Sequence, residues 1–391
     1  MSSVVSIKNL DVVFGKNKAA TLQLMDQGNS REQVLGETGD VIGVQGANLE
    51  INEGEICVLM GLSGSGKSTL LRVINGLNQV ARGQCLVRNG NDMVDVAACN
   101  SSTLRYIRTH RVSMVFQSFA LMPWLTVLEN VAFGLEMQGM GKAERKVKAM
   151  QQLEMVCLEQ WANKKPDELS GGMRQRVGLA RAFAMDTDIL LMDEPFSALD
   201  PLIRTQLQDE LIELQKQLNK TIIFVSHDLD EALKIGTKIA IMESGKIIQE
   251  DIPEQIVLNP KTDYVKKFVA HTNPLNVLKG NSLMTPLSSL EKNGSKYTLQ
   301  DKLIVTLDDA NHIVSVSDSK QTVNIVKYST DLDCSQLKGK NIVLAPADIT
   351  MRDAVEMRYQ TSYPVLLHYD QAVAGILGDH DFYHALLGKH F

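Results

Sequence analysis

The chain has 391 residues, which exceeds one typical domain and predicts two. Its net charge of −6 gives no electrostatic support to a role in binding nucleic acid. Its five cysteines lack the spacing of disulfides or metal ligands, which fits a reducing compartment, and no apolar run reaches the ~18 residues of a membrane helix.

Two strands and an insertion are expected at the start of the chain. The strands cover residues 3–14 and 42–51, and Phe14 is the last residue of the first strand. The segment between them, residues 16–41, is polar and contains two helix-forming runs. The sequence therefore predicts a helical insertion that begins directly after Phe14.

A glycine-rich turn follows the short apolar run at residues 55–60. Such a run is typical of a strand buried in a parallel sheet, and a helix is predicted to begin near Lys67. A strand, a glycine-rich turn and a helix in this order are the context of a phosphate-binding loop. The residues of this loop that we expect to bind nucleotide are Gly61, Ser63, Gly64, Ser65, Gly66, Lys67, Ser68 and Thr69.

The residue types of this loop determine its chemistry. Glycines let backbone N–H groups surround phosphate oxygens, and the helix N-terminus adds a partial positive charge. We expect Lys67 to reach the β- and γ-phosphates of ATP as a catalytic group, and the Ser68 hydroxyl to ligate Mg²⁺. The alternative is a Gly/Ser linker that happens to contain a lysine, which the strand–helix context disfavours.

A second apolar strand, over residues 188–192, is followed by two carboxylates, Asp193 and Glu194. Open α/β sheets bind ligands at the carboxyl ends of their strands. We expect Asp193 to hold Mg²⁺ through water and Glu194 to polarise the attacking water as a general base. The alternative is a solvated acidic turn.

The heptapeptide from Leu169 to Gln175 begins another helix. A helix N-terminus suits anions, although Ser170 is also a favoured cap residue of an ordinary helix. The phosphate loop, this heptapeptide and Asp193-Glu194, in that order, resemble the nucleotide-binding subunits of ABC transporters. The resemblance implies an α/β P-loop ATPase domain with a mostly parallel sheet, an antiparallel β subdomain and a helical subdomain.

The resemblance also implies that the active form pairs two ATPase units, so the chain needs a second copy of itself or a paralogue. Ser170, Gly171, Gly172 and Gln175 then face the γ-phosphate that a second copy binds, and Asp200 belongs to the loop that touches the partner's site. One chain therefore carries half of each composite ATP site.

Three further residues receive roles from the same resemblance. Gln117 matches the residue that approaches Mg²⁺ and the water and reports to the membrane partner, and His227 matches the histidine that contacts the γ-phosphate and positions the water. Phe14 resembles the aromatic residue that stacks on adenine. It precedes the phosphate loop by 47 residues (61 − 14), more than is usual in the family, and core packing is its alternative.

The apolar segment Phe119–Thr126 resembles the part of the family's groove that receives a coupling helix of the permease, with buried core as the alternative. The insertion at 16–41 resembles importers of glycine betaine, proline betaine and choline, and Pro123-Trp124-Leu125 is most like the choline branch. The implied cofactors are ATP and Mg²⁺. The implied partners are a separate membrane permease and, indirectly, a substrate-binding protein, with the subunit peripheral on the cytoplasmic face of the inner or plasma membrane.

The expected domains are an ATPase domain over 1–273 and a C-terminal domain over 274–391, divided at Asn273-Pro274. The end of the chain predicts a helix, two strands and a helix, an order that resembles a CBS module. Gly378 stands where such modules place Thr, so we do not expect adenine-nucleotide sensing there.

Two other functions are open at this stage. A soluble ABC ATPase of DNA repair or translation is disfavoured, because the 102 residues between Gly66 and Leu169 lack heptads and the chain has one ATPase unit. An ATP-gated scaffold that does not hydrolyse ATP is disfavoured by the presence of Glu194 and His227. The expected function is the ATP-hydrolysing subunit of a quaternary-amine importer.

Overall fold

The computed structural model describes residues 2–387 except 198, 271, 300–302, 319–320, 330–331, 333–336 and 338–340. The chain forms two compact units, Met1–Ile252 and Pro253–Phe391. Each unit has its own sheets and its own hydrophobic core. Cys334, one of the five cysteines, and Ala198, next to Asp200, lie outside the described residues.

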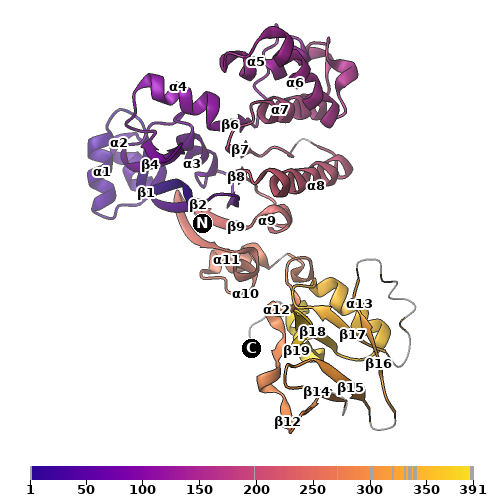
Figure 1. Ribbon diagram of the computed structural model, residues 1–391. Coiled ribbons are helices and arrows are strands. Elements are labelled where there is room, and N and C mark those ends of the chain that lie inside the picture. The colour runs from indigo at the N-terminus through magenta and orange to yellow at the C-terminus, as the bar shows by residue number, and fades with distance from the viewer. Residues whose placement is uncertain are drawn as a thin grey trace. The chain divides into compact units, whose positions relative to one another are not determined.

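The first unit is built on a six-stranded sheet with the order β10-β9-β3-β8-β7-β6. Its strands are β3 (Ile56–Met60), β6 (Val112–Val115), β7 (Ile189–Asp193), β8 (Thr221–Val225), β9 (Lys238–Glu243) and β10 (Lys246–Asp251). All neighbours are parallel except the β9–β10 hairpin. Since β6, β7 and β8 are parallel neighbours (Figure 1), their carboxyl ends meet at one edge of the sheet.

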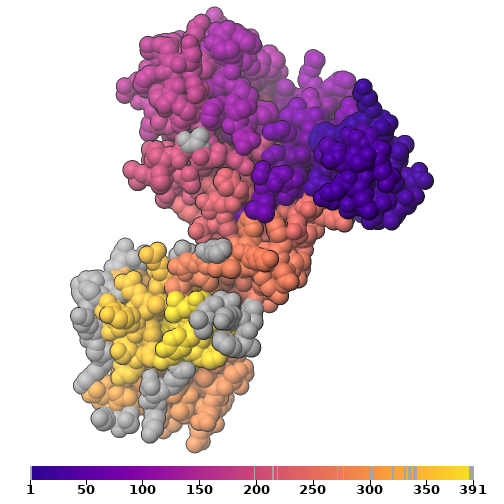
Figure 2. All heavy atoms as spheres, turned by 180° about the vertical axis from the view of Figure 1, so that it is seen from behind, coloured from indigo at the N-terminus to yellow at the C-terminus, as the bar shows by residue number. Residues whose placement is uncertain are grey.

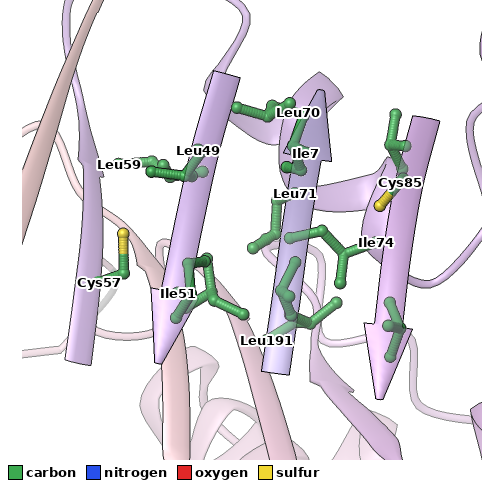
Figure 3. Close-up of a cluster of buried hydrophobic side chains, with 14 of the residues drawn as sticks. Ile7, Leu49, Ile51, Cys57, Leu59, Leu70, Leu71, Ile74, Cys85 and Leu191 are labelled. Carbon is green, nitrogen blue, oxygen red and sulfur yellow. The ribbon is translucent and has the colours of Figure 1, made fainter. Parts of the chain in front are cut away.

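A four-stranded antiparallel sheet, β2-β1-β4-β5, completes the β structure of this unit. Its strands are β1 (Ser3–Phe14), β2 (Val41–Asn52), β4 (Arg82–Asn89) and β5 (Asp92–Asp95). One buried core joins both sheets to α3 (Lys67–Ile74), and Figure 3 shows Ile7, Leu49, Leu70 and Leu191 within it. Because α3 lies in this shared core, the phosphate loop at its N-terminus is fixed relative to both sheets.

Two helices lie in the connection between β1 and β2, which are paired strands of the antiparallel sheet. They are α1 (Lys18–Asp26) and α2 (Arg31–Thr38), and both lie within the expected insertion at 16–41. Their small core consists of Met25 and Val34 against Val13 and Ile42 of the flanking strands. The insertion is therefore packed on the sheet from which it departs.

A helical region follows β6. Its helices are α5 (Val127–Met137), α6 (Lys142–Met155), η1 (Glu159–Trp161), η2 (Pro166–Glu168) and α7 (Gly171–Ala184). They enclose a separate core that includes Val131, Leu153 and Val177. The remaining helices of the unit are α4 (Ser101–His110), α8 (Pro201–Leu218) and α9 (Leu229–Ile235).

The second unit contains two further sheets. The five-stranded sheet has the order β11-β19-β18-β17-β16, and the four-stranded antiparallel sheet has the order β12-β13-β14-β15. The strands are β11 (Thr285–Pro286), β12 (Glu291–Asn293), β13 (Lys296–Thr298), β14 (Ile304–Leu307), β15 (Ile313–Ser317), β16 (Asn324–Lys327), β17 (Asn341–Pro346), β18 (Val365–Tyr369) and β19 (Ala372–Leu377). The helices are α10 (Pro253–Leu258), α11 (Asp263–Val269), η3 (Pro274–Asn276), α12 (Gly280–Leu283), η4 (Leu287–Ser289), α13 (Met351–Thr361) and α14 (Asp379–Leu387).

The division between the units differs from the expected boundary at 273/274. It falls after Ile252, 21 residues earlier (273 − 252). Leu258 of α10 and Leu275 of η3 both pack against the core of the second unit. Asn273-Pro274 is therefore not an open linker, because Asn273 caps η3 and the residues on either side of this pair contribute to one core.

Candidate nucleotide-binding and hydrolysis site

The phosphate loop connects β3 to α3 through two glycines at which a Cβ would clash with neighbouring backbone atoms. Gly61 has φ +140°, and a Cβ on it would lie 2.1 Å from the carbonyl oxygen of Met242. Gly66 caps α3 at φ +102°, where a Cβ would lie 2.5 Å from the oxygen of Gly43. The loop therefore keeps its backbone curved and tightly packed against neighbouring strands. Ser63 and Gly64 are exposed at its tip, and Thr69 continues the helix.

Lys67 is buried and lies along the inner side of this loop. Its Nζ donates to the carbonyl oxygens of Gly61 at 2.7 Å and Leu62 at 3.0 Å. Burial lowers the pKa of Lys67, while the carboxylates of Glu194 and Asp193 act in the opposite direction. The ammonium group is thus held at the phosphate loop, with the carboxylates of Glu194 and Asp193 near enough to affect its pKa. The Ser65 hydroxyl is also buried there, without a hydrogen-bond partner among the described residues.

Ser68 and Asp193, 125 residues apart in sequence, meet at the end of β7. The Ser68 Oγ donates to Asp193 Oδ1 at 2.6 Å, and Arg72 donates to Asp193 Oδ2 at 2.9 Å. Asp193 is fully buried. A hydroxyl and a carboxylate, side by side, are the hard oxygen ligands that Mg²⁺ prefers, so these residues fit the ion.

Arg72 is a site residue that the sequence analysis missed. It forms an ion pair with Asp193, and it stands four residues after Ser68 on α3. Residues four apart share one helix face. This spacing was the available signal, since a basic residue one turn beyond Ser68 faces the same carboxylate.

Glu194 lies at the centre of a cluster from three strand ends. Gln117 Nε2, after β6, donates to Glu194 Oε2 at 3.2 Å, and His227 Nδ1, after β8, lies 3.5 Å from the same oxygen. The Glu194 backbone has φ +50° and its N–H donates to the oxygen of Val225 at 3.1 Å. This left-handed conformation costs ~1–2 kcal/mol, which the neighbouring strand must offset. The turn directs the carboxylate away from the sheet and toward Gln117 and His227.

The N-terminus of α7 presents a polar, accessible surface. Ser170 is exposed, and its Oγ accepts from the N–H of Met173 at 3.3 Å as the cap of the helix. Gly171 and Gly172 follow without side chains that would cover the first turn. Asp200 is also exposed and caps α8, accepting from the N–H of Ile203 at 3.1 Å.

Gln175 differs from the expectation for this motif. It is only 2% exposed, and its Nε2 donates to the backbone oxygens of Glu194 and Pro195. The side chain thus supports the turn that holds Glu194 in its own chain. In the single chain the Gln175 side chain is therefore turned inward, whereas Ser170 of the same motif is exposed.

Phe14 lies at the end of β1 with its side chain 44% exposed, which excludes core packing. A Cβ on Gly43 would lie 2.7 Å from the Phe14 ring and 3.0 Å from the γ-methyl of Thr69. The ring therefore lies over a glycine and close to the phosphate-loop helix. An exposed aromatic face at this place is suited to stacking against a base.

These arrangements agree with three comparisons. A family model described as ABC transporter matches residues 44–197. The chain is 54% identical over 268 residues to the glycine betaine/proline betaine transport system ATP-binding protein ProV of Escherichia coli K12, covering 68% of this chain and 66% of ProV. It is 38% identical over 384 residues to the glycine betaine/carnitine transport ATP-binding protein GbuA of Listeria monocytogenes, covering 96% of this chain and 95% of GbuA.

The chain belongs to the ATP-binding subunits of ABC transporters. A solved dimeric ATP-binding cassette, in a post-hydrolysis state with bound ADP and Pi, is 33% identical and has a TM-score of 0.55. The match covers 64% of this chain and 98% of the solved cassette. The first unit of this ABC subunit is accordingly a P-loop ABC ATPase, as expected from its motifs.

A groove of about 360 Å³ in this ABC subunit lies between β6, α5 and α7. Its lining includes the methionines Met114, Met122, Met137 and Met185. Methionine side chains adapt to irregular apolar partners. Trp124, in the segment that follows Gln117, is 70% exposed, so it is not core.

Arg181 is a second residue that the sequence analysis missed. It lines the groove, and its guanidinium donates to the backbone oxygens of Ala120 at 2.6 Å and Phe119 at 2.9 Å. Both of these residues have positive φ, at +47° and +62°. Burial lowers the pKa of Arg181. The arginine thus holds the strained turn that leads from Gln117 to the groove.

The second unit contains the expected helix–strand–strand–helix order as α13, β18, β19 and α14. Asp381, three residues after Gly378, is 6% exposed. Its carboxylate accepts from the Gly378 N–H at 2.8 Å and from the Thr285 hydroxyl at 3.1 Å. These contacts occupy the carboxylate inside the unit. Among the described residues of the whole chain, none forms a helix long and apolar enough to cross a membrane.

Proposed function

We propose that this chain powers the import of quaternary amines of the glycine betaine and choline type by hydrolysing ATP. The observation that carries this proposal is the meeting of Lys67, Ser68, Asp193 and Glu194 at one sheet edge, beside the phosphate loop. The substrate class is supported by relatives named for glycine betaine, proline betaine and carnitine transport.

In the proposed mechanism, the phosphate loop captures ATP and Lys67 exchanges the carbonyls of Gly61 and Leu62 for the β- and γ-phosphates. Phe14 stacks on the adenine. Ser68 would ligate Mg²⁺ and Asp193 would hold it through water, and Arg72 keeps the buried Asp193 carboxylate paired. Bound Mg²⁺ supplies charge neutralisation at the phosphates.

Glu194 then takes a proton from the attacking water. Gln117 and His227 lie beside the same carboxylate oxygen, so they hold the water and the γ-phosphate in line. Preorganised groups of this kind lower the barrier mainly through position and electrostatics. Gln175 acts behind the site, by fixing the backbone that carries Glu194.

We further propose that two copies form the active unit. The exposed N-terminus of α7, with Ser170, Gly171 and Gly172, faces the γ-phosphate of the partner's ATP, and Asp200 lies against the partner's site. The partial positive charge and free N–H groups of a helix N-terminus support this role. A related cassette structure is described as dimeric, with ADP and Pi bound.

The proposed permease contact is the groove together with the segment Phe119–Thr126. An apolar groove lined by methionines and an exposed Trp124 suit the apolar face of a helix. The subunit then acts as a peripheral protein on the cytoplasmic face of the membrane. A substrate-binding protein would deliver the amine from the other side.

The test compares uptake in cells of the source organism with the native chain and with Lys67→Ala. Radiolabelled glycine betaine, choline and leucine are supplied separately. Loss of glycine betaine or choline uptake, with leucine uptake unchanged, supports the proposal. Unchanged uptake of both amines, with a defect in DNA repair or translation, would instead assign the chain to the soluble ABC ATPases.

A further inference from the structure

The insertion between β1 and β2 is the feature of the first unit that the proposed function does not use. It separates two residues that pair in the sheet, since Phe14 of β1 lies opposite Val41 of β2. The two ends of the insertion, Gly15 and Asp40, are therefore neighbours directly beside Phe14. The insertion belongs to the indigo region of the surface in Figure 2.

Asp40 closes this insertion. Its side chain is 2% exposed and accepts from the N–H of Lys16 at 3.0 Å and the N–H of Asn17 at 3.0 Å. It also accepts from the hydroxyl of Thr21 in α1 at 3.0 Å. One buried carboxylate thus holds the segment that leaves β1 and the first turn of α1.

The contact between Asp40 and the chain after Phe14 is close. Gly15 has φ +150°, and a Cβ on it would lie 1.9 Å from Asp40 Oδ1. A glycine is required at this position because the carboxylate occupies the space that a side chain would need. Phe14 itself is paired with Val41, and Asp40 holds the backbone that follows Phe14 through the N–H of Lys16.

The Phe14 ring depends on this backbone for its place. A Cβ on Gly43 would lie 2.7 Å from the ring, so Gly43 offers no side chain at this place, and Phe14 is 44% exposed. A ring with this exposure has part of its surface free of protein contacts that could hold it. A ring that must offer one face to a base needs its Cα held in place by other contacts.

We propose that Asp40 is a positioning residue for the adenine base, because it fixes the backbone that carries Phe14. The proposal rests on the proposed function of Phe14 in stacking on ATP. Asp40 then affects the binding of the base and leaves the binding of the phosphates unchanged. The insertion lengthens the spacing from Phe14 to the phosphate loop. Asp40, at the end of the insertion, binds the backbone at its start and so keeps the two ends together beside Phe14.

The test measures how full-length variants bind two ligands, a fluorescent ATP analogue and inorganic triphosphate, which has no base. Alanine substitution at a base-stacking aromatic costs roughly 5- to 160-fold in affinity, so Phe14→Ala sets the upper limit. We expect Asp40→Ala to weaken ATP binding about 3- to 10-fold relative to triphosphate, within that limit. Thr21→Val keeps the shape of the side chain and removes the hydroxyl that donates to Asp40. It should weaken ATP binding relative to triphosphate by less than Asp40→Ala does.

Asp95→Asn is the matched control. Asp95 also accepts from backbone N–H groups, of Cys85 and Ala97, but it lies on β5, separated from β1 by β4. It should leave the ratio of the two affinities unchanged. Equal weakening of ATP and triphosphate by Asp40→Ala, or an unchanged ratio in Thr21→Val when Asp40→Ala does not fold, would overturn the proposal. An unchanged ratio in Phe14→Ala would instead remove the proposed stacking role.

Discussion

Replacing Glu194 by Gln is the change that isolates the chemical step. The substitution keeps the shape of the side chain, one oxygen that accepts from Gln117, and the same left-handed backbone cost at φ +50°. Only the basic carboxylate is lost. Removal of a general base typically lowers the rate ~10²–10⁴-fold. With about 1.36 kcal/mol for each factor of ten, the barrier rises by about 2.7–5.4 kcal/mol.

The assay pairs phosphate release with the affinity for a fluorescent ATP analogue. The Glu194→Gln variant should bind MgATP with an affinity close to that of the wild type, because Lys67 and the phosphate loop are unchanged. Its hydrolysis should fall by at least a factor of 100, on the order given above. Glu213→Gln, on the exposed side of α8, is the control and should hydrolyse normally. Hydrolysis by Glu194→Gln within a factor of about three of the wild type would refute the assignment of the base.

Three further outcomes are expected. Ser170→Arg should leave ATP binding by the single chain intact and prevent ATP-dependent pairing in gel filtration, since Ser170 is exposed at the proposed interface; normal pairing contradicts the composite site. Trp124→Ala should lower amine transport by the assembled complex and leave hydrolysis by the isolated subunit unchanged, because the side chain is 70% exposed. Trp161→Ala, in the helical region outside the groove, is its control, and equal loss of both activities in Trp124→Ala contradicts a coupling role. A chain that ends at Ile252, the end of the first compact unit, should fold and hydrolyse ATP; an unfolded product in circular dichroism shows that the second unit is required.

The sequence predicted the parts of the site that local patterns encode. The phosphate loop is one strand, one turn and one helix, so its conformation follows from Gly61, Gly66 and their neighbours. The parallel sheet then brings Ser68 to Asp193 across 125 residues, and the alternation of strands and helices was sufficient to predict that meeting.

Other features required tertiary information. Gln175 lies in the same motif as the exposed Ser170, and only the packing of α7 shows that its side chain faces inward. Asn273-Pro274 has the local composition of a linker, yet Leu275 packs into the core of the second unit. The contact of Asp40 with the chain after Phe14 also required the structure, because a carboxylate 25 residues after Gly15 (40 − 15) gives no local sign of contact.

The central claim is that each chain supplies half of two composite ATP sites. The most direct test is the mass of the full-length Glu194→Gln variant, measured by light scattering after gel filtration with and without MgATP. Because slow hydrolysis preserves bound ATP, the account predicts twice the monomer mass with MgATP and the monomer mass without nucleotide. A monomer at saturating MgATP, under conditions in which the fluorescent analogue confirms binding, would contradict the claim.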